Sequence, residues 1–349
     1  MISNKGIEYL ETYLNELAKE GAFPGECFGI VTHDGSYFGQ AGYAQIRPYV
    51  RKMREDSIFD IASLTKVVAT TTSIMILIEM GEIRLDEKIR NILPQYKHND
   101  TTVLQLLTHT SGLPADVKFY KICNDPAEII DKLYNTDLEY KPGELVLYSD
   151  LNYMLLGLII KRIAEPVDKF SKKYVFNPLG MSDTSFTLPK EKLDRCVATE
   201  YKEGRGIIVG QVHDGNAYAL GGISGHAGLF STAHDLGRFA AMILNDGCYR
   251  GSMILSEASV KLISSCYTDK LNESRGLGWR IKRAGDKIGD AVYIGSLYHT
   301  GFTGTSILID RTAGLGFVLL TNRIHPSRNN ESLLGLRSHI NDLAEQTVK

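Results

Sequence analysis

The sequence predicts an α/β fold of the α+β type: an antiparallel sheet flanked by N- and C-terminal helices, with a mostly helical subdomain inserted between the strands. Three observations lead to this prediction. Strand-like segments occur near both ends of the chain, and the long middle region has helical periodicity. The composition, 43% hydrophobic and 23% charged, is that of a folded globular protein. The two sets of strands are expected to share one sheet, with a cleft between the sheet and the helices.

The 349 residues are interpreted as one domain, 1–349. Its α/β subdomain is expected to comprise about 1–60 and 240–349, and its helical subdomain about 61–239. The chain opens with an amphipathic helix, because apolar residues recur at helical spacing among acidic ones near its start. A hairpin follows, with strands at 27–32 and 37–43 joined by the turn sequence His33-Asp34-Gly35-Ser36.

The middle region has five segments with helical patterning, and Gly81 stops the first of them. They are 64–80, 103–107, 126–134, 152–164 and 233–244. The last hundred residues return to strand patterning, and a closing helix is expected to cover the sheet. These strands are predicted at 276–282, 292–298, 305–310 and 315–321, and the helix at 332–345.

Charge and hydropathy exclude several classes of partner. The 39 basic and 41 acidic residues give a net charge of −2, and no segment concentrates bases into a face for nucleic acid. The longest apolar stretches, 74–78 and 153–160, are far shorter than the ~20 residues of a membrane span, so no membrane partner is expected. Because the first helix is amphipathic and not an apolar signal segment, a cytoplasmic location is expected. The five scattered cysteines predict neither a disulfide framework nor a zinc knuckle.

The tetrapeptide Ser63-Leu64-Thr65-Lys66 is the only Ser-x-x-Lys in the chain and lies where a helical segment begins. Residues three apart share a helix face, so the Ser63 hydroxyl and the Lys66 amine are expected to meet. A serine becomes a nucleophile when a neighbouring base or positive field assists it, and a lysine and a helix N-terminus can do this. The alternative is an ordinary N-cap serine followed by an unrelated lysine.

Two further motifs favour the catalytic interpretation. Tyr148-Ser149-Asp150 precedes a helical segment, and His299-Thr300-Gly301 lies in a late strand. With these motifs in this order, the chain resembles the serine β-lactamase and penicillin-binding-protein-like superfamily, in its branch of class C β-lactamases, DD-peptidases and family VIII carboxylesterases. Other segments similar to that branch are 106–114, 141–144, 177–181 and 228–232.

The resemblance implies roles for specific residues. Ser63 would be acylated, Lys66 would hold or shuttle its proton, and Tyr148 would be the second base, in its phenolate form through its coupling to Lys66. The backbone N–H groups of Ser63 and Phe302 would form the oxyanion hole. No cofactor is expected, and the expected partner is a small-molecule ester, amide or peptide.

Two positions depart from the pattern of the members that act on β-lactams. His299 stands where lysine is usual, and a histidine is mostly neutral at pH 7, so the fixed cation that would receive a substrate carboxylate is expected to be lost. Thr300 beside it can still donate a hydrogen bond, and Gly301 lets a substrate approach closely. Asp150 stands where asparagine is usual and could pair with Lys66 or select a substrate donor. The nearby Asn152 is a candidate substitute.

A glycine-rich segment, 212–228, is predicted to be a structured loop over the cleft. His213 and His226 are candidates for substrate contact, as is Asp214. Together with His234 and Asp235 these residues could instead hold a metal, although their spacing matches no familiar ligand pattern and no metal site is predicted. Loop-fixing hydrogen bonds are the third alternative. His109 is interpreted as a buried organiser of its turn.

The function that the sequence favours is a serine acyl-hydrolase acting through an acyl-enzyme, as an esterase or a peptidase for D-amino-acid or cell-wall-type peptides. The loss of a cation at His299 argues against avid β-lactamase activity, although weak activity is compatible with it. One alternative is a penicillin-binding-like module with little or no turnover. Another is a metal-dependent hydrolase that uses the loop between His213 and Asp235.

Overall fold

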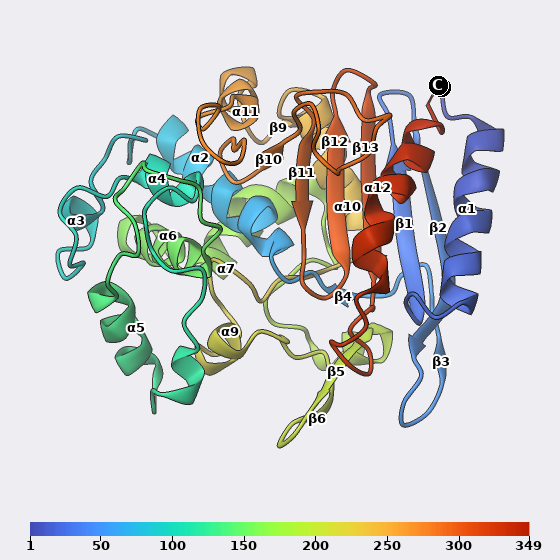
Figure 1. The fold of residues 1–349 in the computed structure, drawn as a ribbon, viewed down its shortest axis with the longest axis horizontal. Helices are drawn as coiled ribbons and strands as arrows, with labels where there is room; N and C mark the ends of the chain where they lie inside the picture. The colour runs from blue at the N-terminus through green and yellow to red at the C-terminus, as the bar shows by residue number, and fades with distance from the viewer. Residues whose placement is uncertain (349) are drawn as a thin grey trace.

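One seven-stranded antiparallel sheet forms the centre of the fold in the computed structural model, which describes residues 1–348 (Figure 1). Its strands are β1 (Gly25–Val31), β2 (Ser36–Gln45), β3 (Arg51–Lys52), β10 (Arg280–Ile281), β11 (Leu297–Thr300), β12 (Thr305–Asp310) and β13 (Leu315–Thr321). They lie in the order β10-β11-β12-β13-β1-β2-β3. Strand β13 pairs antiparallel with β1, with Leu319 opposite Phe28. The two ends of the chain therefore share one sheet, which confirms the predicted fold class.

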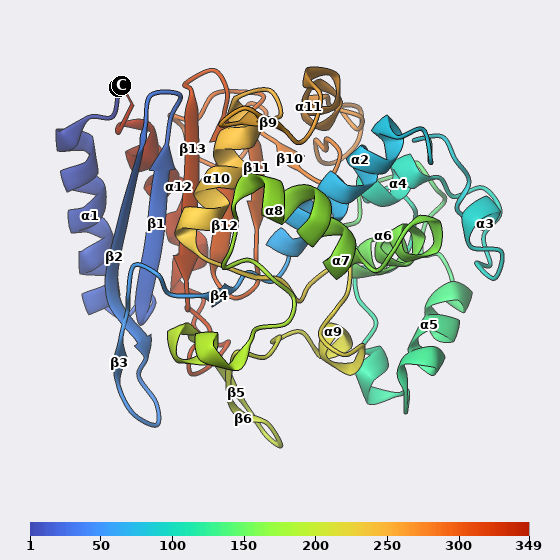
Figure 2. The same cartoon turned by 180° about the vertical axis from the view of Figure 1, so that it is seen from behind.

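Helices cover both faces of this sheet. Helices α1 (Asn4–Lys19) and α12 (Ser332–Glu345) pack together on one face, and α10 (Ala233–Leu244) crosses the other, as the views from the two sides show (Figures 1 and 2). Strand β1 is buried on both faces. Because alternate residues of a strand point to opposite faces, Phe28 and Ile30 join the core under α1 and α12, whereas Cys27 joins the core on the α10 side.

The remaining elements form the helical half of the molecule and three small β-ribbons (Figure 1). The helices are α2 (Thr72–Glu79), α3 (Ile89–Ile92), α4 (Val103–Leu107), α5 (Pro126–Asn135), α6 (Asp150–Ile163), α7 (Val167–Ser171), α8 (Asn177–Leu179), α9 (Gly215–Ala219) and α11 (Glu257–Ser264). Two π-helical segments, η1 (Lys66–Thr71) and η3 (Lys172–Phe176), and two 3₁₀ segments, η2 (Phe119–Lys121) and η4 (Lys190–Arg195), complete them. The ribbons pair β4 (Phe59–Asp60) with β7 (Phe230–Ser231), β5 (Ala198–Lys202) with β6 (Gly206–Val209), and β8 (Cys248–Tyr249) with β9 (Ser252–Met253).

The predicted helix at 64–80 is present, but its winding changes along its length. The helix begins at Leu64, becomes the π-helix η1 and then continues as α2. The hydroxyl of Thr72 donates to the carbonyl of Val67, five residues earlier, at 2.9 Å, which suits the wider π turn. π-helical turns inside α-helices occur frequently at functional sites. This one begins at Lys66.

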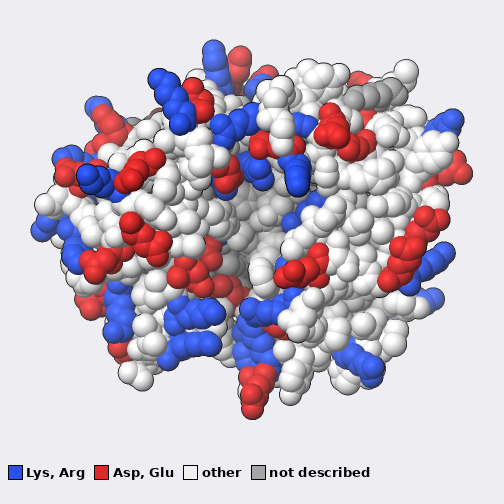
Figure 3. Space-filling view, in the orientation of Figure 1, with Lys and Arg blue, Asp and Glu red and all other residues white. Residues whose placement is uncertain are grey.

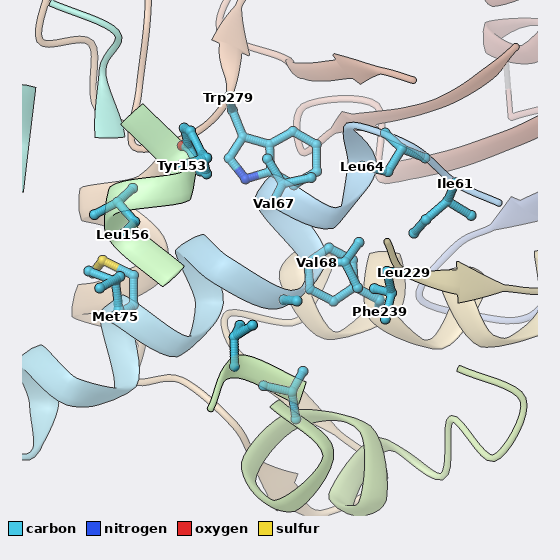
Figure 4. Close-up of a cluster of buried hydrophobic side chains, with 14 of the residues drawn as sticks. Ile61, Leu64, Val67, Val68, Met75, Tyr153, Leu156, Leu229, Phe239 and Trp279 are labelled. Carbon is cyan, nitrogen blue, oxygen red and sulfur yellow. The ribbon is translucent and has the colours of Figure 1, made fainter. Parts of the chain in front are cut away.

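The start of this helix is fixed in the core between the sheet and the helical half. Val67 and Val68 are fully buried, and the buried cluster around them includes Phe239 of α10, Tyr153 of α6 and Trp279 (Figure 4). A close-packed interior allows side chains little freedom to shift. The element that carries Ser63 and Lys66 is therefore held rigidly.

Two predicted strands are much shorter than expected. The prediction at 276–282 leaves only β10, and the one at 292–298 leaves β11, which begins at Leu297. Glycines in left-handed backbone interrupt both segments: Gly278 has φ +85° and Gly295 has φ +94°. A Cβ at Gly278 would also lie 2.4 Å from the Thr71 hydroxyl, so the chain there packs directly on the π-helix.

The segment 212–228 is not only loop, because it contains the short helix α9. Asp214 caps this helix by accepting a hydrogen bond from the N–H of Ala217 at 2.7 Å. Aspartate is a strongly preferred N-cap residue, so Asp214 is the residue in the sequence that could have indicated this helix.

Two further expectations concern membrane-spanning helices and disulfide bonds. Among residues 1–348, no helix combines the length and apolar character that crossing a bilayer requires. The five cysteines are all free thiols in the same described residues.

Burial of Glu26 predicts how stability depends on pH. Its side chain is 1% exposed, and burial, followed by the nearby Glu11, raises its pKa well above the ordinary value of a glutamate. A raised pKa stabilises the fold below the pKa of the unfolded chain, and this contribution is lost as pH rises through the folded pKa. Substitution Glu26→Gln should therefore raise the melting temperature at pH 8 by a few degrees and have less effect at pH 5.

Thermal unfolding followed by circular dichroism at the two pH values measures this difference. Glu8→Gln, at an exposed position of α1, is the matched control and should change neither value. A Glu26→Gln protein that is less stable than the parent at pH 8 would contradict the prediction.

Candidate active site

Ser63 lies in the turn that leads from β4 into the π-helix. Ala62 before it has φ +47°, a left-handed conformation that a non-glycine residue rarely adopts. The turn is held by hydrogen bonds from the N–H of Ala62 to Asp60 at 2.9 Å and from the hydroxyl of Thr65 to the carbonyl of Ala62 at 2.6 Å. Backbone strain of this kind clusters at functional sites. Here it presents Ser63 at the end of a helix.

Lys66 is fully buried one turn further along, and its ammonium contacts three groups. Nζ donates to the hydroxyl of Ser63 at 3.0 Å and to the carbonyl of His226 at 3.1 Å, and it forms an ion pair with Asp150 at 2.7 Å. Burial alone would lower the pKa of Lys66, but Asp150 and Tyr148 outweigh it and raise that pKa above the ordinary lysine value. Lys66 is therefore an ammonium ion beside the serine hydroxyl, and not a free base.

Tyr148 joins this group from the segment before α6. The Lys66 nitrogen lies 4.9 Å from the centroid of the Tyr148 ring, and the ring also packs against His109 at 4.5 Å. The next residue, Ser149, donates its N–H to Nδ1 of His109 at 3.1 Å and its hydroxyl to the carbonyl of Pro114 at 2.6 Å. The structure thus brings the three predicted catalytic side chains together, with buried His109 organising the segment that carries Tyr148 and Asp150.

The turn after β11 contains the second predicted oxyanion donor. Within residues 1–348, the N–H groups of Ser63 and Phe302 donate to no protein acceptor. The hydroxyl of Thr303 donates to the carbonyl of Asp60 at 2.8 Å, and that of Thr305 donates to the carbonyl of Ile61 at 3.0 Å. These bonds tie the two segments that carry the free N–H groups, so the donors are positioned before a substrate arrives.

Gly301 precedes Phe302 in this turn. A Cβ at Gly301 would lie 2.1 Å from the Thr305 hydroxyl and 2.5 Å from the Ile61 carbonyl. Only glycine allows so close an approach of the two segments. Both Thr300 and Gly301 line the cleft that contains Ser63.

His299 is buried on β11 and also lines this cleft. Its Nδ1 donates to the carbonyl of Thr300 at 3.0 Å, because a carbonyl can only accept, and its Nε2 has no partner in the described chain. Burial, together with the charges of Lys66 and Arg275, holds the pKa of His299 well below its usual range. His299 is therefore neutral, and its Nε2 can accept a hydrogen bond. The sequence analysis expects no fixed cation at this position.

His226 and His213 occupy buried positions at the cleft. His226 is 1% exposed and is fixed by Asp214 at 2.9 Å and by the hydroxyl of Ser224 at 2.8 Å, while its carbonyl accepts from Lys66. His213 contacts Glu200 at 2.7 Å, and its ring stacks on that of Phe302 with centroids 5.5 Å apart. Both residues line the cleft, and both make the loop-fixing contacts considered above.

One predicted substrate contact needs correction. Asn152 is fully buried on α6, where it accepts a hydrogen bond from Ser111 at 2.6 Å and lies 3.4 Å from His109. It is not among the residues that line the cleft. The first turn of α6 points Asp150 toward Lys66 and Asn152 into the interior, so Asn152 does not substitute for the asparagine that Asp150 replaces.

The residues considered for a metal site do not form one group. His234 contacts Glu55 at 2.8 Å, and Asp235 accepts from Thr184 at 2.9 Å. Asp150, Asp214 and His226 do bring ligand atoms within 4.8 Å of one another. In that group Lys66 already supplies a positive charge to Asp150, so the metal-hydrolase alternative gains no support from this arrangement.

Sequence reasoning missed the arginines of the cleft. The cleft has a volume of about 650 Å³, and five arginines line it: Arg275, Arg280, Arg323, Arg328 and Arg337. Figure 3 shows the hollow with basic side chains on two of its sides. The arginines come from separate segments late in the chain, so no local motif in the sequence could have gathered them. Their charges were visible, but their convergence depends on the fold.

Comparison with known proteins identifies the family of the chain. The sequence profile of the β-lactamase family, described as "Beta-lactamase", matches residues 10–340. The chain therefore belongs to the β-lactamase family.

Relatives within the family carry different names. The chain is 31% identical, over 78% of its length and 71% of the relative's, to a putative D-alanyl-D-alanine carboxypeptidase of Escherichia coli K12. It is 30% identical, over 87% of its length and 78% of the relative's, to an N-acetylmuramyl-L-alanine amidase of Bacillus subtilis 168. Among solved structures it resembles EstCE1, a hydrolase with promiscuous acyltransferase activity, with a TM-score of 0.79, 20% identity and 98% coverage of both chains. The last comparison supports the fold.

The Lys66–Asp150 ion pair leads to a prediction about stability. A raised lysine pKa stabilises the fold below the unfolded pKa, and this contribution is lost only as pH rises through the folded pKa. In Asp150→Asn, burial would dominate and lower the pKa of Lys66, so the charged lysine would destabilise the fold at neutral pH. We expect a loss on the order of 3 kcal/mol in unfolding free energy at pH 7 and a smaller loss at pH 9.5.

Urea unfolding at the two pH values tests this prediction. The control is Asp100→Asn, which removes the partner of Lys88 from an exposed ion pair and should cost no more than about 1 kcal/mol. A loss for Asp150→Asn that grows with pH, or that only equals the control, would show that the ion pair does not hold Lys66 charged.

Proposed function

We propose that this protein is a serine hydrolase that cleaves an ester or amide through an acyl-enzyme on Ser63. The observation that carries the proposal is the contact between the Lys66 ammonium and the Ser63 hydroxyl, in a cleft that also holds Tyr148 and two unoccupied backbone N–H donors. A nucleophile, a positive field and a preorganised oxyanion site are the parts that acyl transfer requires.

The arrangement assigns a different task to each group. Lys66 remains protonated and stabilises negative charge on the Ser63 oxygen, while Tyr148 acts as a phenolate that accepts the hydroxyl proton and, as the resulting phenol, returns it to the leaving group. The carbonyl oxygen of the substrate binds the N–H groups of Ser63 and Phe302, and negative charge develops there as Ser63 attacks. Water then attacks the acyl-enzyme. Tyr148 accepts a proton from this water and returns it to the Ser63 oxygen as the acyl group is released.

Arg275 suggests which leaving groups the enzyme accepts. Its side chain is buried beside Tyr148, with the guanidinium carbon 5.5 Å from the Tyr148 ring centroid, and it is held by Glu273 at 2.7 Å. The Nε of Arg275 is buried without a hydrogen-bond partner in the described residues. Arg275 thus supplies the cation that His299 does not, on the side where Tyr148 protonates the leaving group. We therefore favour a peptide substrate whose leaving amino acid ends in a carboxylate, in line with the carboxypeptidase name of the Escherichia coli relative.

The nucleophile is tested with an activated short-chain ester. Wild-type protein should release nitrophenol from 4-nitrophenyl acetate with a burst followed by steady turnover, and Ser63→Ala should lose at least ~10³-fold in rate because the catalytic groups act as a unit. Ser182→Ala, at an exposed serine, is the matched control. Full activity in Ser63→Ala would refute the proposal, and a burst without turnover would favour the binding-module alternative.

The role of Arg275 is tested with paired peptides. Arg275→Gln should raise KM for an acetylated D-alanyl-D-alanine peptide by roughly 10-fold or more, because a charge-assisted hydrogen bond is lost. It should leave KM for 4-nitrophenyl acetate unchanged, since that ester carries no carboxylate. Equal effects on both substrates, or equal cleavage of the peptide and its C-terminal amide by the wild-type protein, would contradict carboxylate recognition by Arg275.

A further inference from the structure

Two arginines of the cleft, Arg323 after β13 and Arg337 on α12, have no acidic partner. Among residues 1–348 neither forms an ion pair within 4.0 Å. Their hydrogen-bond acceptors are carbonyls. Arg323 donates to Asn330 at 2.7 Å and to Phe302 at 2.9 Å, and Arg337 donates to Thr305 at 3.2 Å.

The other cleft arginines differ in this respect. Arg275 pairs with Glu273, Arg280 pairs with Asp286, and Arg328 makes two hydrogen bonds to Glu200 at 2.6 and 2.7 Å. The charge of Glu331 raises the pKa of Arg323, but the two residues form no ion pair in the described chain.

Both uncompensated arginines are at least partly removed from water. Arg323 is 4% exposed and Arg337 is half-buried, and the Nε of each arginine is buried without an acceptor in the part of the chain that the structure describes. Both arginines line the same cleft, and burial and then the charge of Arg337 lower the pKa of Arg323, so the two positive charges repel each other. Buried like charges without a counterion are unfavourable, and an anion placed between them would relieve both the repulsion and the unmet hydrogen bonds.

We infer that Arg323 and Arg337 form a subsite for an anionic group, a carboxylate or a phosphate, on the acyl portion of the substrate. The subsite adjoins the reacting carbonyl, because Arg323 binds the carbonyl of Phe302, whose N–H is the proposed oxyanion donor. It is distinct from Arg275, which lies against Tyr148 on the leaving-group side. The assignment to the acyl portion rests on the proposed function, whereas anion binding itself does not.

Anion binding is measured first, on a protein that cannot turn over. Calorimetry of Ser63→Ala with glutarate and, separately, inorganic phosphate at constant ionic strength should show saturable binding of at least one of them. Adding Arg337→Gln should weaken it by ~10-fold or more, the effect of losing a charge-assisted hydrogen bond. Adding the control Arg90→Gln on the exposed helix α3 should not, and adding Arg275→Gln shows whether the ion binds at the leaving-group cation instead.

The pattern of binding identifies the ligand chemistry. Glutarate alone supports a carboxylate, and phosphate alone supports a phosphate. If neither binds at 10 mM, or if binding depends on Arg275 and not on Arg337, the inference is overturned. Arg337→Lys, which keeps the charge, should retain part of the affinity, and its unfolding temperature verifies that the fold is intact.

Turnover then tests the acyl side. Mono-4-nitrophenyl glutarate and 4-nitrophenyl valerate share a leaving group and a five-carbon acyl chain, and only the glutarate carries an acyl carboxylate. If the subsite accepts carboxylates, Arg337→Gln should raise KM for the glutarate ester ~10-fold and leave the valerate ester unchanged; equal changes would reduce Arg337 to a structural role. If wild-type protein cleaves neither ester, the proposed hydrolase function fails, while calorimetry still decides the subsite.

Discussion

The buried ammonium of Lys66 is the constraint on which the active site depends. A charge removed from water is tolerated only when nearby groups satisfy it. Three segments meet for this purpose: the nucleophile turn with Ser63, the start of α6 with Asp150, and the loop before β7 with the carbonyl of His226. Each contact comes from a different part of the chain. The groups that stabilise the Lys66 charge therefore also bring the segments of the site together.

This arrangement also separates two tasks that a single lysine could otherwise combine. Asp150 stabilises the protonated form of Lys66, so in the proposed mechanism Lys66 contributes charge and Tyr148 transfers the proton. A neutral His299 on β11 keeps a further positive charge away from this pair. The cations proposed to bind acidic groups of the substrate are instead Arg275 and the Arg323–Arg337 subsite, which line the same cleft.

Much of the fold could be predicted because its signals are local. Strands β12 and β13 and helices α10 and α12 have the predicted bounds, since their hydrophobic patterns begin and end sharply. The convergence of Ser63 and Lys66 was also predictable, because it needs only one helical turn. The cleft arginines and the burial of Asn152 could not be predicted, since they depend on how distant segments pack. The strands predicted within 276–298 were too long, because the prediction did not consider that Gly278 and Gly295 could adopt left-handed backbone.

The central claim, that Asp150 keeps Lys66 protonated beside Ser63, is tested most directly by NMR of the resting protein labelled with ¹⁵N at lysine side chains. The Lys66 signal is assigned by its loss in Lys66→Arg. It should have the Nζ chemical shift of an ammonium from pH 6 to pH 10, because Asp150 raises the pKa of Lys66 above the ordinary lysine value of about 10.4. A Lys66 signal with the shift of a neutral amine at pH 8 would contradict the account.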